Sequence, residues 1–262
     1  MGLVGGGVCM WREIAVLRFW FFVSFSGFLC KSAGWNSPHG VTEMVLSLRH
    51  RFLFVHIAKT AGSSLRHSLR RIQRRDPWYV LQFAASRLSH VSGHRIASKL
   101  PRHARIIAAK EMLPEPFFDS LFKFSFVRNP WDRYVSAYHH IMREQRHLLK
   151  GDESFDGFLR LVFDPERPWQ YHLDTFSTVE WSYLVDLEGR CCVDFIGRYE
   201  RLEADYEEVF RRIGIRAPGL AHERMSSGRK DYRSYYTDET AGWVADRHRA
   251  DLEHLAYTFD PE

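Results

Sequence analysis

The chain has 262 residues, of which 45% are hydrophobic and 26% are charged. These are globular values, so they exclude a chain that is disordered throughout, a collagen-like chain and a protein with many membrane spans. Lys and Arg exceed Asp and Glu by five, and this surplus favours an anionic ligand without choosing among phosphate, sulfate, an acidic sugar and nucleic acid.

The four cysteines are too few for a disulfide scaffold. Cys9 and Cys30 lie near the N-terminus, and Cys191 is followed directly by Cys192. No Cys or His cluster has the spacing of a zinc site, so we expect no metal.

Residues 1–43 differ in pattern from the rest of the chain. They contain a 12-residue apolar run, Phe19–Cys30, which is shorter than the roughly 20 residues that span a bilayer. The run is typical of a signal-peptide apolar region or a marginal signal anchor, which would attach the protein to a membrane through residues 14–30. The alternative is that Met44 is the natural start, which predicts a cytoplasmic enzyme. In either case we expect one domain over residues 44–262, after a leader that is signal-like, disordered or extraneous.

From Met44 onward, short β-rich runs alternate with helical patterns. This alternation predicts a single α/β domain with a central parallel sheet flanked by helices. The predicted strands are 52–57, 105–109, 122–127 and 193–197. The first predicted helix begins near residue 62. Four further helices are predicted at 131–147, 155–162, 202–213 and 240–257.

The first chemical signal is the turn after the first buried strand. Lys59 is followed by Thr60 and Ala61, then by Gly62, Ser63 and Ser64 at the start of a helix. Unpaired N–H groups and the helix dipole favour an anion at such a helix start. The sequence is not a Walker A loop, in which the lysine stands at the end. An ordinary strand-to-helix connection is the alternative.

The second signal is the segment RNPWDRYVSAY, residues 128–138. Arg128 ends a predicted strand, where ligands of open α/β sheets bind, and Ser136 lies about two helical turns further on. A guanidinium and a hydroxyl at this spacing suit a phosphate. The alternative is that Arg128 pairs with a local carboxylate and Ser136 is merely exposed.

Together the two segments resemble a known family. FVHIAKTAGSSL, residues 54–65, and FSFVRNPWDRYVSAY, residues 124–138, resemble carbohydrate sulfotransferases that use 3′-phosphoadenosine 5′-phosphosulfate (PAPS). The nearest group is the family-2 set of chondroitin, dermatan and heparan 2-O type enzymes with their bacterial relatives. The C-terminal segments 195–215 and 234–259 also resemble that family. The resemblance implies a P-loop-like, three-layer fold and transfer of a sulfonate group from PAPS to a carbohydrate hydroxyl.

The resemblance also implies a role for each matching residue. Lys59 would hold the transferring sulfonate and stabilise charge on the leaving group. Arg128 and Ser136 would bind the 3′-phosphate, and Arg229 and Lys230 would add a loop contact on that side unless they are simply solvated. The 5′-phosphate would be bound by Thr60, Ala61, Gly62, Ser63 and Ser64, mainly through backbone N–H groups.

Sulfonate transfer to a hydroxyl also needs a general base. Relatives often carry a histidine before a helix in the interval that contains His90 and His94, and His94 fits that pattern better. Glu111 is the carboxylate alternative, because it follows the predicted strand 105–109. His56, inside the first strand, is interpreted as structural.

The predicted function is in-line sulfonate transfer from PAPS to a carbohydrate or glycan acceptor, with no metal and no nucleic-acid partner. The positive charge favours an acidic saccharide. Two alternatives stay open: a nucleotide or sugar kinase with a P-loop-like site, and a non-catalytic module that binds polyanions through the basic helix 66–75. The sequence leaves the acceptor, the sulfated position and the oligomeric state undetermined.

Overall fold

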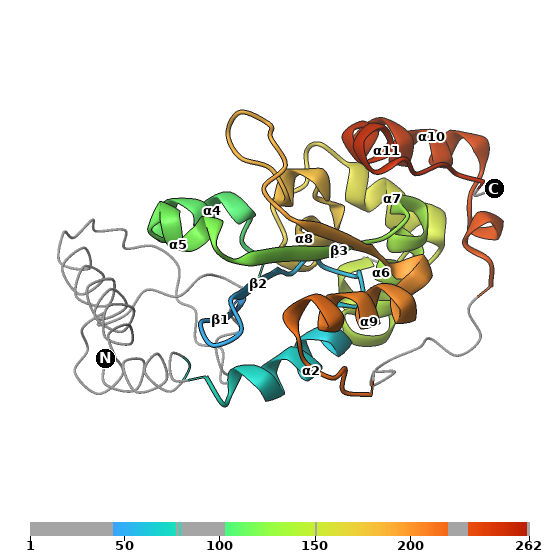
Figure 1. Ribbon diagram of the computed structural model, residues 1–262. Coiled ribbons are helices and arrows are strands. Elements are labelled where there is room, and N and C mark those ends of the chain that lie inside the picture. The colour runs from blue at the N-terminus through green and yellow to red at the C-terminus, as the bar shows by residue number, and fades with distance from the viewer. Residues whose placement is uncertain (1–43, 77–78, 80–102, 150, 220–229, 261–262) are drawn as a thin grey trace, which may run out of the picture.

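A four-stranded sheet forms the centre of the computed structural model, which describes residues 44–76, 79, 103–149, 151–219 and 230–260. The strands lie in the order β1-β2-β3-β4 (Figure 1). β2 pairs in parallel with β3, and β3 pairs in parallel with β4. The strands are β1 (Val45–Ser47), β2 (Phe52–Val55), β3 (Phe122–Val127) and β4 (Phe195–Arg198).

The sheet is mixed, which corrects the prediction of a purely parallel one. β1 runs antiparallel to β2, with Val45 opposite Phe54 and Ser47 opposite Phe52. Residues 48–51 are all that separate the two strands, and a parallel crossover needs a dozen or more residues. The short connection therefore makes β1 an antiparallel edge strand, which the sequence interpretation missed.

The prediction of a strand at 105–109 is wrong. Ile106–Met112 form helix α4, with Ile106 and Ala109 buried three residues apart on one face. Helix α5 (Glu115–Asp119) follows directly. A short apolar run bounded by charged residues does not distinguish a buried strand from a short helix, and here three-residue spacing was the informative signal.

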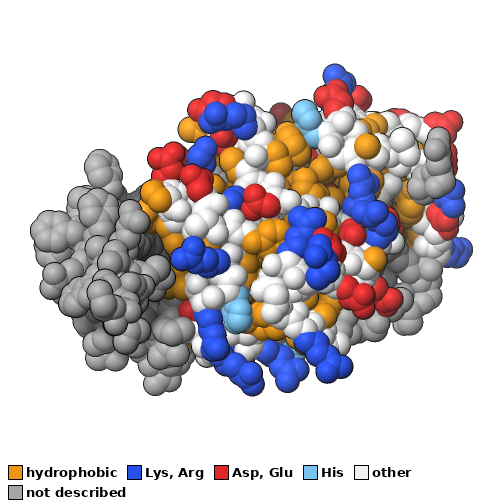
Figure 2. Space-filling view, viewed as in Figure 1, with side chains coloured by type: hydrophobic (Ala, Val, Ile, Leu, Met, Phe, Trp, Pro, Cys, Tyr) orange, Lys and Arg blue, Asp and Glu red, His pale blue; other side chains and the backbone are white. Residues whose placement is uncertain are grey.

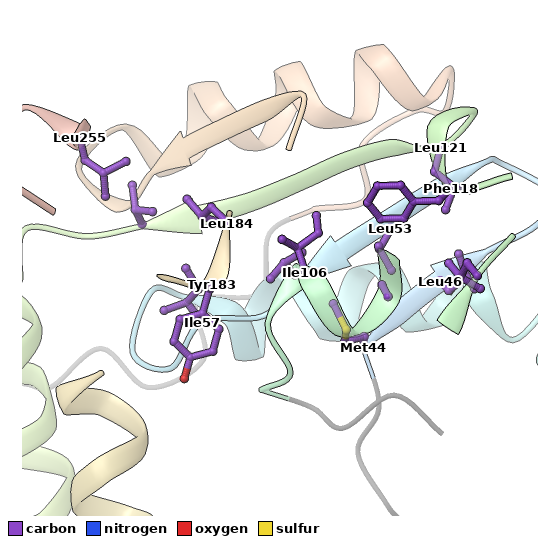
Figure 3. Close-up of a cluster of buried hydrophobic side chains, with 14 of the residues drawn as sticks. Met44, Leu46, Leu53, Ile57, Ile106, Phe118, Leu121, Tyr183, Leu184 and Leu255 are labelled. Atoms are coloured by element: carbon purple, nitrogen blue, oxygen red, sulfur yellow. The ribbon is translucent and has the colours of Figure 1, made fainter. Parts of the chain in front are cut away.

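Helices cover both faces of the sheet. Leu53 and Val55 face a cluster that includes α4, α5 and the C-terminal helix α11 (Arg249–Leu255), with Ile106, Phe118 and Leu255 among its members (Figure 3). Phe52 and Phe54 face the opposite side, because successive strand residues alternate between faces. There they pack against α2 (Gly62–Gln73) and α9 (Leu202–Ile213).

A third apolar cluster is formed mainly by helices. It contains α6 (Pro130–Glu144), α7 (Phe155–Phe163), α8 (Tyr171–Ser177) and α10 (Asp238–Arg247). Short 3-10 turns complete the order of elements at Arg146–Leu149, Trp181–Tyr183, Tyr199–Arg201 and Tyr232–Tyr235.

The predicted helix bounds agree best where the apolar pattern is strongest. Residues 202–213 are predicted and observed as one helix. The predicted C-terminal helix 240–257 is two helices, α10 and α11, which meet at His248. The His248 ring is fully buried and its Nδ1 lies 2.7 Å from Asp251 Oδ2, so this side chain fixes the break between the helices.

Among the residues that the structure describes, no helix is both long enough and apolar enough to span a bilayer. The leader 1–43, with its apolar run and the proposed anchor 14–30, lies outside the described residues.

Candidate functional site

The carboxyl ends of the three parallel strands converge on one site. β2 leads into the loop 56–61, β3 into Arg128 and Asn129, and β4 into Tyr199 and Glu200. Ligands of open α/β sheets bind at this edge. The two segments singled out in the sequence are therefore neighbours in space.

The loop between β2 and α2 has an unusual backbone. Lys59 has φ 70° and Ala61 has φ 60°, and neither is glycine. Such left-handed residues cost free energy and concentrate at functional sites. Thr60 lies between them, buried, with its hydroxyl donating to the Ile57 carbonyl at 3.0 Å. The Thr60 side chain thus closes the loop, a contact that the sequence interpretation did not predict.

The start of α2 is left open to an anion. Ala61 is its N-cap residue, no side chain caps the helix, and its first turn holds no acidic residue. The first N–H groups of a helix have no partner within that helix. The Ser64 N–H donates to the Ala61 carbonyl at 3.1 Å. The helix dipole, the N–H groups before Ser64 and the neighbouring Lys59 together suit a negatively charged group.

Gly62 is needed for a reason that the sequence did not reveal. A Cβ built at this position would lie 1.9 Å from His56 Nε2, because the histidine ring packs directly beneath the loop. His56 is buried, and its ring is 4.7 Å from the ring of His103. The structure therefore agrees with the structural interpretation of His56.

We expect Gly62→Ala to displace the His56 ring and lower the free energy of unfolding by about 1–3 kcal/mol, as overpacking does. Urea unfolding followed by circular dichroism measures this loss. A second substitution, His56→Ala, removes the clashing ring and should restore part of the stability. A Gly62→Ala protein as stable as the original would contradict the close packing.

The second segment begins α6 with strong local signals. Pro130 occupies the first helical position. The Asn129 side chain accepts hydrogen bonds from the N–H groups of Trp131 at 3.0 Å and Asp132 at 3.4 Å. The Asn129 N–H donates to Glu200 at 2.7 Å, which ties this helix start to the end of β4.

Arg128 is 3% exposed and lies between the two segments. Its Nη1 donates to the Lys59 carbonyl at 3.0 Å, and its Nε donates to Asp132 at 2.7 Å. Its guanidinium carbon lies 3.8 Å from the centre of the Tyr199 ring. Burial lowers the pKa of Arg128, yet arginine keeps its charge in proteins.

Arg128 therefore has the local carboxylate partner that was the alternative interpretation. Its Nη2 is buried and has no hydrogen-bond partner among the described residues, although Asp132 lies 2.7 Å away as an ion pair. Ser136 is half-buried on α6, and no hydrogen bond joins it to Arg128 in the described structure. Both Nε and Nη2 of Arg128 therefore face the Asp132 carboxylate, and Nη1 faces the Lys59 carbonyl.

Arg133 is a residue of the candidate site that the sequence interpretation missed. It is fully buried, and its Nε donates to the Ala58 carbonyl at 3.1 Å. Its Nη1 donates to the Thr178 carbonyl at 3.0 Å. Because Arg128 holds the next carbonyl of the loop, two arginines of the second segment fix the first. The available signal was spacing: Arg133 precedes Ala137 and Ile141 at four-residue intervals on the buried stripe.

Glu180 is the buried acid that faces these two arginines. It is fully buried, its Oε1 lies 3.4 Å from Arg133 Nη1, and its Oε2 accepts from the Arg128 N–H at 3.2 Å. Burial raises the pKa of Glu180 to about 8, and the Arg133 charge opposes this rise. Asp251 of α11 accepts hydrogen bonds from the N–H groups of Glu180 at 3.0 Å and Trp181 at 2.6 Å. These bonds hold the backbone at Glu180 in place.

Several predicted site residues lie elsewhere or outside the described chain. His90, His94 and Arg229 fall on residues that are not described. Lys230 is exposed, just before the turn Tyr232–Tyr235. Glu111 is exposed on α4, so the reason for considering it, a preceding strand, no longer holds. Within the described ranges, no group of three or more His, Cys, Asp or Glu side chains is placed to hold a metal ion.

The fold and site together define an α/β protein with a strand–loop–helix turn, suited to an anion, at the carboxyl edge of its sheet. A profile of the Sulfotransferase family matches residues 42–257, and the chain belongs to that family. This match confirms the resemblance seen in the two sequence segments.

Curated relatives agree with the family assignment. Carbohydrate sulfotransferase 14 of Mus musculus is 27% identical over 229 residues, which cover 76% of this chain and 54% of the relative. The Danio rerio protein of that name is 28% identical over 220 residues, covering 68% and 53%. Carbohydrate sulfotransferase 11 of Rattus norvegicus is 25% identical over 209 residues, covering 68% and 55%. The chain thus spans about half the length of these relatives. No solved structure matches it.

Proposed function

We propose that this protein transfers a sulfonate group from PAPS to a hydroxyl of a carbohydrate acceptor. The observation that carries the proposal is the joining of the two segments: Arg128 and Arg133 donate to the consecutive carbonyls of Lys59 and Ala58. This contact joins a helix start suited to an anion to a buried arginine whose guanidinium faces Asp132 and the Lys59 carbonyl. PAPS carries an anionic group at both its 5′ and 3′ ends, so two anion-binding positions suit it.

Each residue has a proposed role in that site. The N–H groups of Thr60, Ala61, Gly62 and Ser63 would bind the 5′-phosphate at the start of α2, and Ser64, whose N–H donates to the Ala61 carbonyl, would contribute its hydroxyl. Lys59 would neutralise charge on the leaving oxygen, and Arg128 with Ser136 would bind the 3′-phosphate. Arg229 and Lys230 remain proposed contacts on the 3′ side, where exposed Lys230 is free to approach a ligand from solvent.

His94 is the proposed general base, with His90 as the alternative, on the family pattern. A neutral imidazole near pH 7 takes the acceptor proton as the hydroxyl oxygen forms its bond to sulfur. PAPS supplies the sulfonate, and adenosine 3′,5′-bisphosphate leaves. Cationic side chains and helix N–H groups provide the charge stabilisation, so the proposal requires no metal.

We also propose a P-loop-like arrangement for residues 44–262 as one sulfotransferase domain. The support is the strand–loop–helix site at β2 and α2, with helices on both faces of the sheet. An acidic glycan is the proposed acceptor class, on the basis of the positive charge. For residues 1–43, membrane attachment and a start at Met44 remain the two proposals for location.

Nucleotide selectivity tests the proposal. Calorimetric titration of the 262-residue protein should show much tighter binding of adenosine 3′,5′-bisphosphate than of 5′-AMP or ATP, because only the first carries a 3′-phosphate. Arg128→Ala should weaken binding of the bisphosphate and leave that of 5′-AMP nearly unchanged. Preference for ATP would favour a kinase, and no binding of any nucleotide would contradict the enzyme.

A further inference from the structure

A row of three buried polar side chains joins α6 to α11. Lys, Arg, Asp and Glu side chains are widespread on the face of the protein seen in Figure 2, whereas His248 and Asp251 are fully buried. The His248 Nδ1 lies 2.7 Å from Asp251 Oδ2, and its Nε2 lies 3.2 Å from the Tyr134 hydroxyl. Tyr134 is also buried and directly follows Arg133 on α6. No step of the proposed reaction uses these three side chains.

The partners of His248 assign its tautomer. Burial lowers the pKa of His248, so its ring is neutral near pH 7, with one nitrogen that donates and one that accepts. Burial raises the pKa of Tyr134, so its hydroxyl stays protonated. All three groups are satisfied when Tyr134 donates to Nε2 and Nδ1 donates to the Asp251 carboxylate. His248 thereby fixes the orientation of that carboxylate.

Asp251 uses the same carboxylate to hold the segment 178–181. Its Oδ2 accepts from the Glu180 N–H at 3.0 Å, and its Oδ1 accepts from the Trp181 N–H at 2.6 Å. The carboxylate therefore faces three donors, two from the backbone and one from His248. An ionised carboxylate can accept from all three, because each of its oxygens has more than one lone pair.

Segment 178–181 in turn positions Arg133. The Arg133 Nη1 donates to the Thr178 carbonyl at 3.0 Å, and its Nε donates to the Ala58 carbonyl at 3.1 Å. One guanidinium thus bridges this segment and the loop that carries Lys59. A displacement of segment 178–181 would therefore move Arg133 and weaken its support of the loop.

Stability alone does not explain the buried His248–Asp251 pair. Burying an ionised carboxylate costs free energy, which its hydrogen bonds offset only when their geometry is good. Well-packed apolar side chains at such positions are often equally stabilising or more so. Buried polar groups do select one arrangement, however, because a misplaced donor or acceptor is left unsatisfied. The pair is therefore suited to fixing a position.

We propose that His248 and Asp251 are positioning residues for sulfonate transfer, an inference that rests on the proposed function. They fix segment 178–181, and Arg133 transmits that position to the Lys59 loop. Neither side chain touches the donor or the acceptor. Loss of the pair should misplace the Lys59 ammonium relative to the transferring sulfonate and leave the start of α2 intact.

Asp251→Asn tests this role by turnover. In either orientation of the new amide, its NH2 group faces one of the two backbone N–H groups, so a hydrogen bond to the segment is lost. We expect turnover per nucleotide-binding site to fall by about 10- to 100-fold, the effect of misplacing a group by about 1 Å, with the affinity for adenosine 3′,5′-bisphosphate changed by less than about threefold. Calorimetry with the bisphosphate counts the binding sites, so misfolded protein does not enter the turnover.

Leu121→Ala is the matched control for stability. Leu121 is buried just before β3, at the end of the sheet opposite the site. Removing its side chain destabilises the protein without touching segment 178–181, so turnover per site should stay at its original value.

His248→Asn and His248→Leu form a second pair of variants. Asparagine keeps an N–H donor near the position of Nδ1, whereas leucine has none. The asparagine variant should therefore retain more turnover per site than the leucine variant. This pair also decides the proposal if Asp251→Asn binds no nucleotide.

Hydrogen–deuterium exchange measures the same coupling without turnover. In Asp251→Asn, the amides of residues 178–181 and 58–61 should exchange about 2- to 10-fold faster relative to those of α9, the ratio that loss of one hydrogen bond produces. Leu121→Ala should leave this ratio unchanged.

Original turnover per site in Asp251→Asn would overturn the proposal, as would equal turnover in the two His248 variants or unchanged exchange at residues 58–61. Absence of sulfonate transfer by the original protein would contradict the proposed function instead. The exchange at residues 58–61 would then still show whether the pair positions the loop.

Discussion

Replacing Lys59 with methionine is expected to lower the rate of sulfonate transfer by at least about 10²-fold, the effect of removing one strong donor to a developing oxyanion. Methionine keeps the length of the side chain and removes its charge. Arg128 holds the Lys59 carbonyl, not its ammonium group, so the loop should keep its backbone. The measurement is the turnover number with saturating PAPS and acceptor.

The loss should fall on turnover more than on binding. We expect the affinity for adenosine 3′,5′-bisphosphate to change only a few-fold, because backbone N–H groups would provide most of the proposed 5′-phosphate site. Lys110→Met is the matched control. Lys110 lies on α4, outside the loop, and forms an ion pair with Asp186. Undiminished turnover in the Lys59→Met protein would refute the assignment of the loop.

The second large effect is expected at Arg133. Arg133→Met removes the side-chain donor to the Ala58 and Thr178 carbonyls, and each buried acceptor left without its partner costs about 1–3 kcal/mol. The Lys59 loop should loosen at the same time, since one of its two arginine contacts is gone. Urea unfolding at pH 7 measures the loss of stability.

The pH dependence of this loss has a definite sign. The pKa of Glu180 is raised from 4.5 to about 8, so its contribution to stability is fully present below pH 4.5 and is lost as pH rises through 8. Removing the Arg133 charge raises the pKa of Glu180 further. The deficit of Arg133→Met should therefore be larger at pH 9 than at pH 6.

Glu180→Gln provides the control, because glutamine cannot ionise. In the Arg133→Met/Glu180→Gln double variant, the excess loss between pH 6 and pH 9 should disappear. A deficit that is the same at both pH values, or that persists in the double variant, would contradict a buried carboxylate beside Arg133.

The sequence predicted the parts of the site that lie on strong local signals. The apolar run before Lys59 and the Asn-Pro start of α6 each mark a boundary, and both loops occupy the expected edge of the sheet. Strand 122–127 and helix 202–213 also have their predicted bounds. In these places pattern and tertiary structure demand the same conformation.

The missed features depend on contacts between distant residues. Nothing near Glu180 in the chain indicates that it accepts from Arg128, 52 positions away. The positive φ of Lys59 and the His56 ring beneath Gly62 are likewise imposed by packing. Arg133 was readable from its place on the buried stripe of α6, but a charged side chain at such a position is usually assigned to the surface.

The central claim is tested most directly by following sulfur from PAPS labelled with ³⁵S, in the presence of desulfated chondroitin, dermatan and heparan chains. We predict that label enters at least one of these polymers, with one adenosine 3′,5′-bisphosphate formed for each sulfonate transferred, and that the Lys59→Met protein does not catalyse the transfer. Label that stays with the nucleotide for every polymer, in a protein that binds the bisphosphate, would contradict the proposed carbohydrate sulfotransferase activity.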